Sequence, residues 1–268
     1  METSGHIFPI TRAVLVIVFA YLIGSIPMGL IVGHVVKGID IREHGSGNIG
    51  LTNVIRTLGW GPGLVTGLLD FFKGYLPVAF VMSSFSPDSF SGVAAVYETT
   101  VILVALLIVV GNLFPVYLMF KGGKGVATGF GVASALIGVY IFIPLAVFAV
   151  FLLVFRMVSV ASICAAVSAP LTVVLLSSHM GFVSESRTAY VLVLMIMCLL
   201  AVLILWSHRS NVGRIISGRE PRVHLFGRKL KAGRGEALNK SPKSTPPVDA
   251  VEPEQPSEAP GDEKELEE

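Results

Sequence analysis

The residues best suited to chemistry are two lysines in a glycine-rich segment. Residues 120–131, FKGGKGVATGFG, contain Lys121, Lys124 and five glycines between two long apolar stretches. Glycines let backbone N–H groups approach an anion closely, and lysines add fixed positive charge. Two other segments, residues 38–56 and 208–222, combine glycine and arginine with Ser, Thr or Asn donors. The three segments together predict a binding site for a phosphate group.

Two familiar phosphate motifs do not account for these segments. GSGNIG, residues 45–50, matches the dinucleotide pattern G-x-G-x-x-G, but it follows a charged segment and has no strand–helix–strand context. GGKG, residues 122–125, fails the Walker A pattern, because Leu118 stands where the first glycine is required and Gly125 replaces the Ser or Thr after the lysine. The predicted site is therefore assembled from several separate segments.

Pairs of polar residues one helical turn apart are the next candidates. His208 and Asn211 begin the third segment, and this spacing places an imidazole beside an amide at the end of an apolar stretch. Ser159 and Ser162 have the same spacing, and serines in apolar helices commonly donate back to helix carbonyls. His208, Asn211 and Ser162 are taken as candidates for the chemistry.

Asp70 and Lys73, in GLLDFFKGYLP, are also one turn apart within an apolar stretch. Their opposite charges predict a mutual ion pair near the cytoplasmic end of a helix. None of the histidines is followed by the aspartate of an H-x4-D pair. A histidine–aspartate acyltransferase site of that kind is not expected.

Helices in a membrane must position these residues. Of the 268 residues, 53% are hydrophobic and only 14% charged, which is typical of an integral membrane protein. The strand-like alternation of a β-barrel is absent. Apolar runs long enough for membrane helices, and one longer stretch, predict an all-α polytopic protein; they cover about residues 13–36, 61–83, 95–119, 126–155, 159–178 and 188–206.

The positive charges predict the topology. Most lysines and arginines outside the tail lie in or beside the segments assigned to one face, whereas residues 84–94 and 179–187 hold almost none. The positive-inside rule puts the charged face in the cytoplasm and the N-terminus outside. All positive segments share that face only if the stretch 126–155 splits near Pro144 into two short helices. We therefore expect about seven membrane helices and a cytosol-facing site.

The last part of the chain has a different composition. Residues 236–268 are rich in Pro, Glu and Ser and nearly lack large apolar side chains, so we expect an acidic, disordered cytoplasmic tail after a membrane domain at 1–235. Cys164 and Cys198 lie in apolar segments without ligand spacing, so neither a disulfide nor a metal site is expected.

Several motifs, in order over about residues 14–222, carry a family resemblance. AYLIGSIPMG, GSGNIGLTNVIR, GNLFPVYLMFKGGKGVAT, RMVSVASI and HRSNVGRIISGREP resemble the motifs of the bacterial membrane glycerol-3-phosphate acyltransferases that use acyl phosphate, the PlsY family. Two positions depart from the family pattern: Asn112 stands where the family usually has His, and Leu51 where it has Ala.

The resemblance implies a reaction and its residues. A fatty acyl group would pass from acyl phosphate to the sn-1 hydroxyl of glycerol 3-phosphate, giving lysophosphatidate and phosphate, the first step of phospholipid biosynthesis. The phosphate of glycerol 3-phosphate would act as base on its own hydroxyl. Catalytic roles would fall to His208, Asn211 and Ser162; substrate and phosphate binding would fall to Ser46, Gly47, Asn48, Arg56, Lys121, Gly123, Lys124 and Glu220.

The same resemblance implies a setting and partners. The protein would lie in the bacterial inner membrane and meet glycerol 3-phosphate, long-chain acyl phosphate and membrane lipid. An enzyme that produces acyl phosphate is a candidate partner, and no cofactor, metal or nucleic acid is expected. A transporter or exchanger of phosphate esters is the alternative, because basic loops and broken helices would also serve it. The sequence shows no matched halves to support that alternative.

Overall fold

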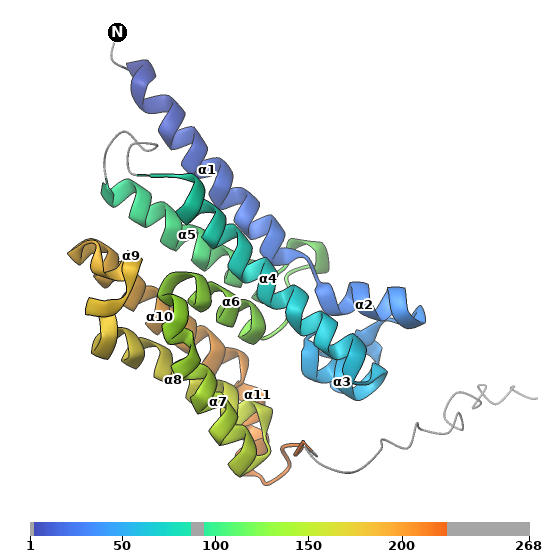
Figure 1. Cartoon of the computed structure of the whole chain (residues 1–268). Helices are drawn as coiled ribbons and strands as arrows, with labels where there is room; N and C mark the ends of the chain where they lie inside the picture. Colours follow the sequence, from blue (N-terminus) through green and yellow to red (C-terminus); the bar gives the residue numbers. More distant parts are fainter. Residues whose placement is uncertain (1–2, 87–93, 224–268) are drawn as a thin grey trace, which may run out of the picture. The chain divides into compact units, whose positions relative to one another are not determined.

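The computed structural model describes residues 3–86 and 94–223, which belong to one compact unit. The described residues form helices and connecting segments without a β-strand. The predicted boundary at residue 235 and the predicted tail lie outside them. The main helices are α1 (Thr3–Ser25), α2 (Met28–Lys37), α3 (Leu51–Leu58), α4 (Trp60–Ser84), α5 (Ala94–Leu113), α6 (Val126–Ile137), α7 (Phe142–Phe155), α8 (Val158–Leu176), α9 (Gly181–Ser184), α10 (Arg187–Ser207) and α11 (Arg209–Ile216) (Figure 1).

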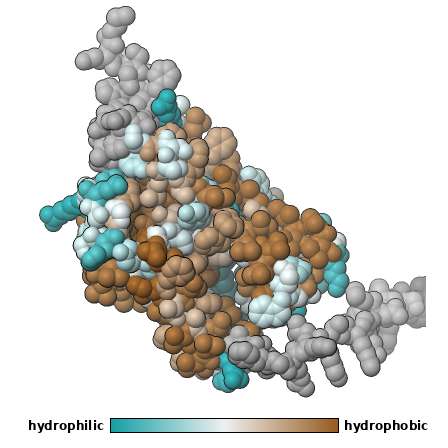
Figure 2. All heavy atoms as spheres, viewed as in Figure 1, coloured by the Kyte–Doolittle hydropathy of each residue, from teal (hydrophilic) through white to brown (hydrophobic). Residues whose placement is uncertain are grey.

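The all-α polytopic membrane fold is confirmed. By length and composition, five helical segments of the described chain are apolar enough to cross a membrane, or six if the bent pair α1–α2 is counted as one span. Large apolar side chains such as Leu175 and Phe80 are exposed, and apolar residues cover much of the face in Figure 2. Such side chains are stable against lipid. The count of seven spans and the orientation of the N-terminus remain predictions.

The stretch 126–155 contains two helices, α6 and α7, as the sequence predicted. In the count of membrane-spanning candidates given above, the two helices together make one of the five segments. A short 3₁₀ turn, η4 (Gly138–Ile141), separates them, and Gly138 supplies a φ of +58° at the break. Pro144 lies just after the break, in the first turn of α7, where its missing N–H breaks no helical hydrogen bond.

The two helices of this stretch run in opposite directions. At one end, Lys124 and Ser159 both reach the hydrogen-bonded pair Asn211–Glu220. At the other end, the Tyr140 hydroxyl donates to the carbonyl of His179, 3.1 Å away. Thus α6 runs parallel to α8, and α7 returns between their ends. With 12 and 14 residues, α6 and α7 are about 18 and 21 Å long, shorter than the roughly 30 Å of a bilayer core.

Glycines set the close approach of two helix pairs. A Cβ added to Gly74 of α4 would lie 2.2 Å from the Thr128 carbonyl oxygen, and one added to Gly131 of α6 would lie 2.1 Å from the Phe71 oxygen. Gly24 of α1 and Gly111 of α5 form a similar reciprocal contact. Small residues of this kind bring membrane helices together. The α4–α6 contact fixes the start of α6, which carries the glycine–lysine segment.

Candidate functional site

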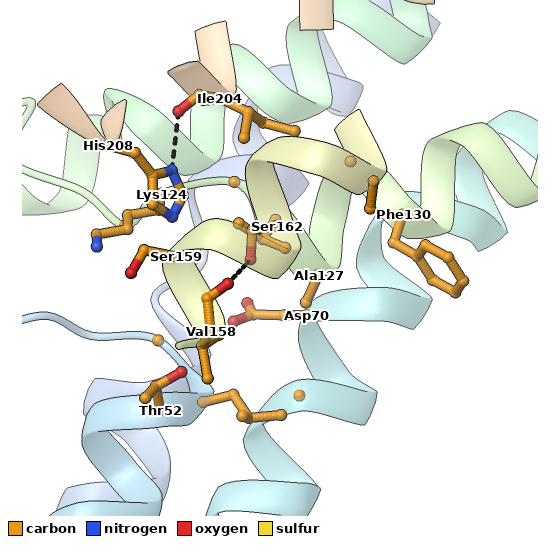
Figure 3. Close-up of a pocket in the computed structure, with 18 of the residues that line it drawn as sticks. Thr52, Asp70, Lys124, Ala127, Phe130, Val158, Ser159, Ser162, Ile204 and His208 are labelled. Atoms are coloured by element: carbon orange, nitrogen blue, oxygen red, sulfur yellow. Dashed lines mark hydrogen bonds between the residues drawn. The ribbon is translucent and has the colours of Figure 1, made fainter. Parts of the chain in front are cut away.

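The three polar segments of the sequence meet at one cavity. It has a volume of about 980 Å³, and Ser46, Lys124 and His208 all line it. Figure 3 shows Lys124, Ser159 and His208 at the same side of this space. Residues separated by more than 160 positions in the chain therefore share one site, as the phosphate prediction required.

A single buried amide holds the first segment. Asn53 on α3 accepts a 2.8 Å hydrogen bond from the Ser46 backbone through Oδ1, and its Nδ2 donates to the carbonyls of Ile41 and His44. The turn itself needs glycine, since Gly45 and Gly47 have φ values of +62° and +71°. This loop brings Ser46 to the cavity, next to the start of α3.

Backbone hydrogen bonds attach the second segment to the end of α5. The N–H groups of Gly122 and Gly123 donate to the carbonyls of Leu113 and Asn112, at 3.1 and 3.0 Å. Gly125, in the left-handed region at φ +74°, then begins α6 without any side-chain cap. The first turn of α6 lines the cavity with Lys124 beside it. A helix N-terminus and an ammonium group together attract an anion.

The third segment joins the second through a chain of hydrogen bonds. Lys124 Nζ donates to Asn211 Oδ1 at 2.5 Å, and Asn211 Nδ2 donates to Glu220 Oε1 at 2.7 Å. Glu220 also accepts from Ser159 Oγ and, at 2.8 Å, from Arg214 Nε. Because Glu220 accepts hydrogen bonds from three side chains, it orients these neighbours.

The electrostatics of this network leave Glu220 ionised. Burial raises the pKa of Glu220, but the hydrogen bonds from Ser159, Asn211 and Arg214 together outweigh burial and leave the pKa below its ordinary value. Burial lowers the pKa of Lys124 to about 8; the Glu220 carboxylate opposes this effect, and the charges of Arg214 and Arg56 add to it. Lys124 is therefore cationic near neutral pH, yet close to titration.

His208 caps the end of α10 and is almost fully buried, with 2% of its surface exposed. Its Nδ1 lies 2.8 Å from the Ile204 carbonyl oxygen, which can only accept, so Nδ1 carries the proton. Burial lowers the pKa of His208 to about 4, and the charge of Lys124 adds to this effect. The ring is therefore neutral at pH 7, with Nε2 available as an acceptor.

The cavity continues from its polar end into an apolar region. Side chains of α4, α6, α7, α8 and α10 line this part, among them Leu68, Phe71, Ala133, Phe148 and Leu200. It has room for a hydrocarbon chain whose polar end meets Lys124. The cavity can thus hold an amphipathic ligand with an anionic end.

Most of the predicted site residues line the cavity. They are Ser46, Asn48, Arg56, Gly123, Lys124, Ser162, His208, Asn211 and Glu220. Lys121 is exposed and, like Gly47, does not line it. The Ser162 hydroxyl donates to the carbonyl of Val158, within its own helix, at 2.8 Å.

Sequence reasoning missed Ser159 and Arg214 as members of the polar network. The spacing of Ser159 and Ser162 drew attention to both serines, but only the structure shows that Ser159 faces Glu220. The predicted ion pair is confirmed, with Asp70 Oδ1 and Lys73 Nζ 2.8 Å apart. Within residues 3–86 and 94–223, no group of three or more His, Cys, Asp or Glu side chains could hold a metal ion.

Comparison with known proteins places this architecture in a family. The profile of the family described as Glycerol-3-phosphate acyltransferase matches residues 14–218. Glycerol-3-phosphate acyltransferase of Prochlorococcus marinus (strain NATL1A) is 38% identical over 210 residues, which cover 78% of this chain and 97% of that protein. The protein of the same name from Chlorobaculum tepidum is 39% identical over 228 residues, covering 80% and 97%.

Solved structures agree with these sequence matches. The crystal structure of PlsY (YgiH), an integral membrane glycerol 3-phosphate acyltransferase, in its glycerol 3-phosphate form is 36% identical with a TM-score of 0.67. Its lysophosphatidic acid form gives a TM-score of 0.65 at the same identity. Each comparison covers 80% of this chain and 96% of the other.

Proposed function

The chain belongs to the glycerol-3-phosphate acyltransferase family, and from this premise we propose that its acyl donor is an acyl phosphate bound in the cavity described above. The protein is a multi-pass membrane acyltransferase that acts on glycerol 3-phosphate.

One observation carries the proposal: the polar end of the cavity combines cations and helix amides with a neutral histidine, and its other end is apolar. An acyl phosphate has a matching shape, with a phosphate at one end of a long hydrocarbon chain. Lys124 and the first turn of α6 supply positive charge for phosphate oxygens, and Ser46 and Arg56 line the same end. The apolar region accommodates the chain.

The chemistry needs positioning more than a strong base. The hydroxyl of glycerol 3-phosphate attacks the carbonyl carbon, a new ester C–O bond forms, and the bond from that carbon to the phosphate oxygen breaks. Phosphate departs with the bonding electrons, and cations and N–H groups stabilise both the tetrahedral oxyanion and the departing phosphate. Acyl phosphates are activated, so fixed donors contribute most of the catalysis.

The proton of the attacking hydroxyl has a nearby acceptor. A phosphate monoester has a second pKa of about 6 and is partly dianionic at pH 7, so the glycerol 3-phosphate phosphate can accept it. His208 Nε2 accepts a hydrogen bond from the second, non-reacting hydroxyl of glycerol 3-phosphate and so helps to position the substrate, while Asn211 holds Lys124 in place. Glu220 acts through Asn211 and Arg214. Ser162 contributes at most to cavity shape.

The positive charges support an orientation with this cavity open to the cytosol of a bacterial inner membrane, where glycerol 3-phosphate is dissolved. An enzyme that makes acyl phosphate is then a suitable partner, because acyl phosphates hydrolyse readily and benefit from direct delivery.

The test uses purified full-length protein in lipid vesicles. With a long-chain acyl phosphate and glycerol 3-phosphate, we expect equal amounts of phosphate and of 1-acyl-glycerol 3-phosphate. Acyl thioesters serve as the comparison donors. Product formation from an acyl thioester but not from acyl phosphate would overturn the donor assignment. Movement of labelled glycerol 3-phosphate into vesicles without any acylated product would favour the transporter.

A further inference from the structure

Lys73 is a buried ammonium group with all three of its protons in use. Its side chain is 3% exposed, and Nζ lies 2.8 Å from Asp70 Oδ1, 2.8 Å from the Ile26 carbonyl oxygen and 2.7 Å from Asn112 Oδ1. An ammonium group has three donors and no acceptor. Lys73 therefore has no proton left for a substrate, and its role is to hold its three partners.

This ammonium group fixes which way the Asn112 amide points. Lys73 can only donate, so the atom facing it must be the amide oxygen, and Nδ2 must face the other way. The Asn112 residue is 6% exposed and lines the cavity. Within the described chain Asn112 Nδ2 makes no hydrogen bond. It is also not one of the side-chain atoms that are fully buried without a partner, so it is accessible from the cavity. A buried amide donor is thus presented to the cavity.

The position of this donor indicates its ligand. A Cβ added at Gly123 would lie 3.4 Å from Asn112 Nδ2, and one at Gly125 would lie 3.8 Å from it, so the amide nitrogen adjoins the turn that carries Lys124. That turn ends at the N-terminus of α6, where the other anion-attracting groups gather. The donor therefore adds to the same anion-binding end of the cavity.

We propose that Asn112 is a further substrate-binding residue, whose Nδ2 donates to a phosphate oxygen of a substrate while Lys73 locks its amide orientation. The inference rests on the proposed acylation site and names one more contact in it. It also accounts for Asn112 at a position where the family resemblance leads us to expect histidine. A neutral imidazole can accept from Lys73 with one nitrogen and donate to the cavity with the other, so Asn and His present the same pattern.

The experiment compares three variants of the full-length protein. Asn112→Asp keeps an oxygen for Lys73 and removes the donor. Asn112→His keeps both, and Asn112→Leu removes both without adding charge. Binding of glycerol 3-phosphate is measured by calorimetry without any acyl donor, and KM is measured for each substrate in turnover. The calorimetric arm does not depend on which acyl donor the enzyme uses, so it distinguishes a failure of this inference from a failure of the donor proposal.

The expected pattern is selective. Asn112→Asp and Asn112→Leu should weaken one substrate about ten- to hundred-fold, the range of one hydrogen bond to a charged group, while Asn112→His stays within about three-fold of the parent. If calorimetry shows weaker binding of glycerol 3-phosphate, the phosphate oxygen that Asn112 contacts belongs to that substrate. If only the KM for acyl phosphate rises, the oxygen belongs to the acyl donor.

A packing role for Asn112 predicts something different. In that case the folded fraction of Asn112→Leu, which adds no charge, would bind both substrates normally, and this result would overturn the proposal. Equal weakening by Asn112→His and Asn112→Asp would also overturn it. If Asn112→Asp does not fold, Asn112→Leu and Asn112→His decide the question by the same comparison. Ser25→Ala is the matched control next to Ile26. Ser25 is buried and does not line the cavity, and within residues 3–86 and 94–223 its hydroxyl bonds only to the Tyr21 carbonyl.

Discussion

Lys124 and Asn211, 87 residues apart in the chain, are joined by a 2.5 Å hydrogen bond from Nζ to Oδ1. This contact connects the glycine–lysine segment to the segment that follows α10. Asn211 is held in turn by Glu220, so the position of the ammonium group depends on both segments. The cationic end of the cavity is therefore built across the fold.

Lys124→Met should remove one of the positive charges that line the cavity. We expect kcat/KM to fall about a hundred-fold or more, since loss of one fixed donor at a developing oxyanion has an effect of this size. Phosphate release at varied acyl phosphate and saturating glycerol 3-phosphate gives this kcat/KM. Lys121→Met is the matched control, because Lys121 carries the same charge three residues away but does not line the cavity. Equal losses in the two variants would contradict the assignment.

The activity should also decline at alkaline pH for the same reason. The pKa of Lys124 is lowered to about 8 by burial, so the free enzyme loses this charge as the pH rises through about 8. The KM for acyl phosphate should rise over that range. Lys124→Arg, which stays charged, should shift or abolish this alkaline limb. If the decline of activity at alkaline pH is the same in Lys124→Arg as in the parent protein, a group other than Lys124 causes it.

His208 should make the protein less stable in acid. Its folded pKa of about 4 lies below the ordinary value of 6.5, so between these values the unfolded chain binds more protons. The stability contributed by neutral His208 is complete above about pH 6.5 and is lost as the pH falls toward 4. His208→Asn should flatten the dependence of Tm on pH over this window. A parallel pH dependence in both proteins would argue against a buried neutral imidazole.

Ser159 and Ser162 should respond differently to substitution by alanine. Ser159→Ala removes a donor to the buried Glu220 carboxylate and should reduce stability by about 1–3 kcal/mol as well as activity. Among the residues that the structure describes, the Ser162 hydroxyl bonds only to a carbonyl of its own helix, so Ser162→Ala should have a small effect. Thermal unfolding and turnover of the two variants, measured side by side, give the comparison. A larger effect at Ser162 would instead indicate a direct role in catalysis.

Gly74→Ala should separate α4 from α6. The added Cβ would meet the Thr128 carbonyl oxygen at 2.2 Å, and backbone atoms cannot move aside as a flexible side chain can. We expect a loss of about 1–3 kcal/mol in stability and a displaced Lys124 segment. Gly61→Ala is the control, because nothing lies within 4 Å of its added Cβ. Thermal unfolding in the same detergent compares the two.

Much of this protein follows from the sequence alone. The excess of apolar residues requires membrane helices, since only helices satisfy backbone hydrogen bonds within a single segment in lipid. The break within residues 126–155 followed from the need to place positive segments on one face. Lysine, arginine and glycine in three segments indicated a phosphate site. Glycine lets backbone N–H groups approach an anion, and lysine and arginine supply the positive charge.

The tertiary structure decided which side chains take part. From helical spacing, Ser159 and Ser162 were equal candidates for the polar site. The packing of α8 against the segment that carries Glu220 places only Ser159 in hydrogen-bond contact with that carboxylate, whereas Ser162 bonds within its own helix. Lys121 and Lys124 have the same charge, yet of these two lysines only Lys124 lines the cavity. The backbone hydrogen bonds from Gly122 and Gly123 to the end of α5 fix this arrangement. These choices depend on contacts between residues far apart in the chain, which local propensity and composition do not encode.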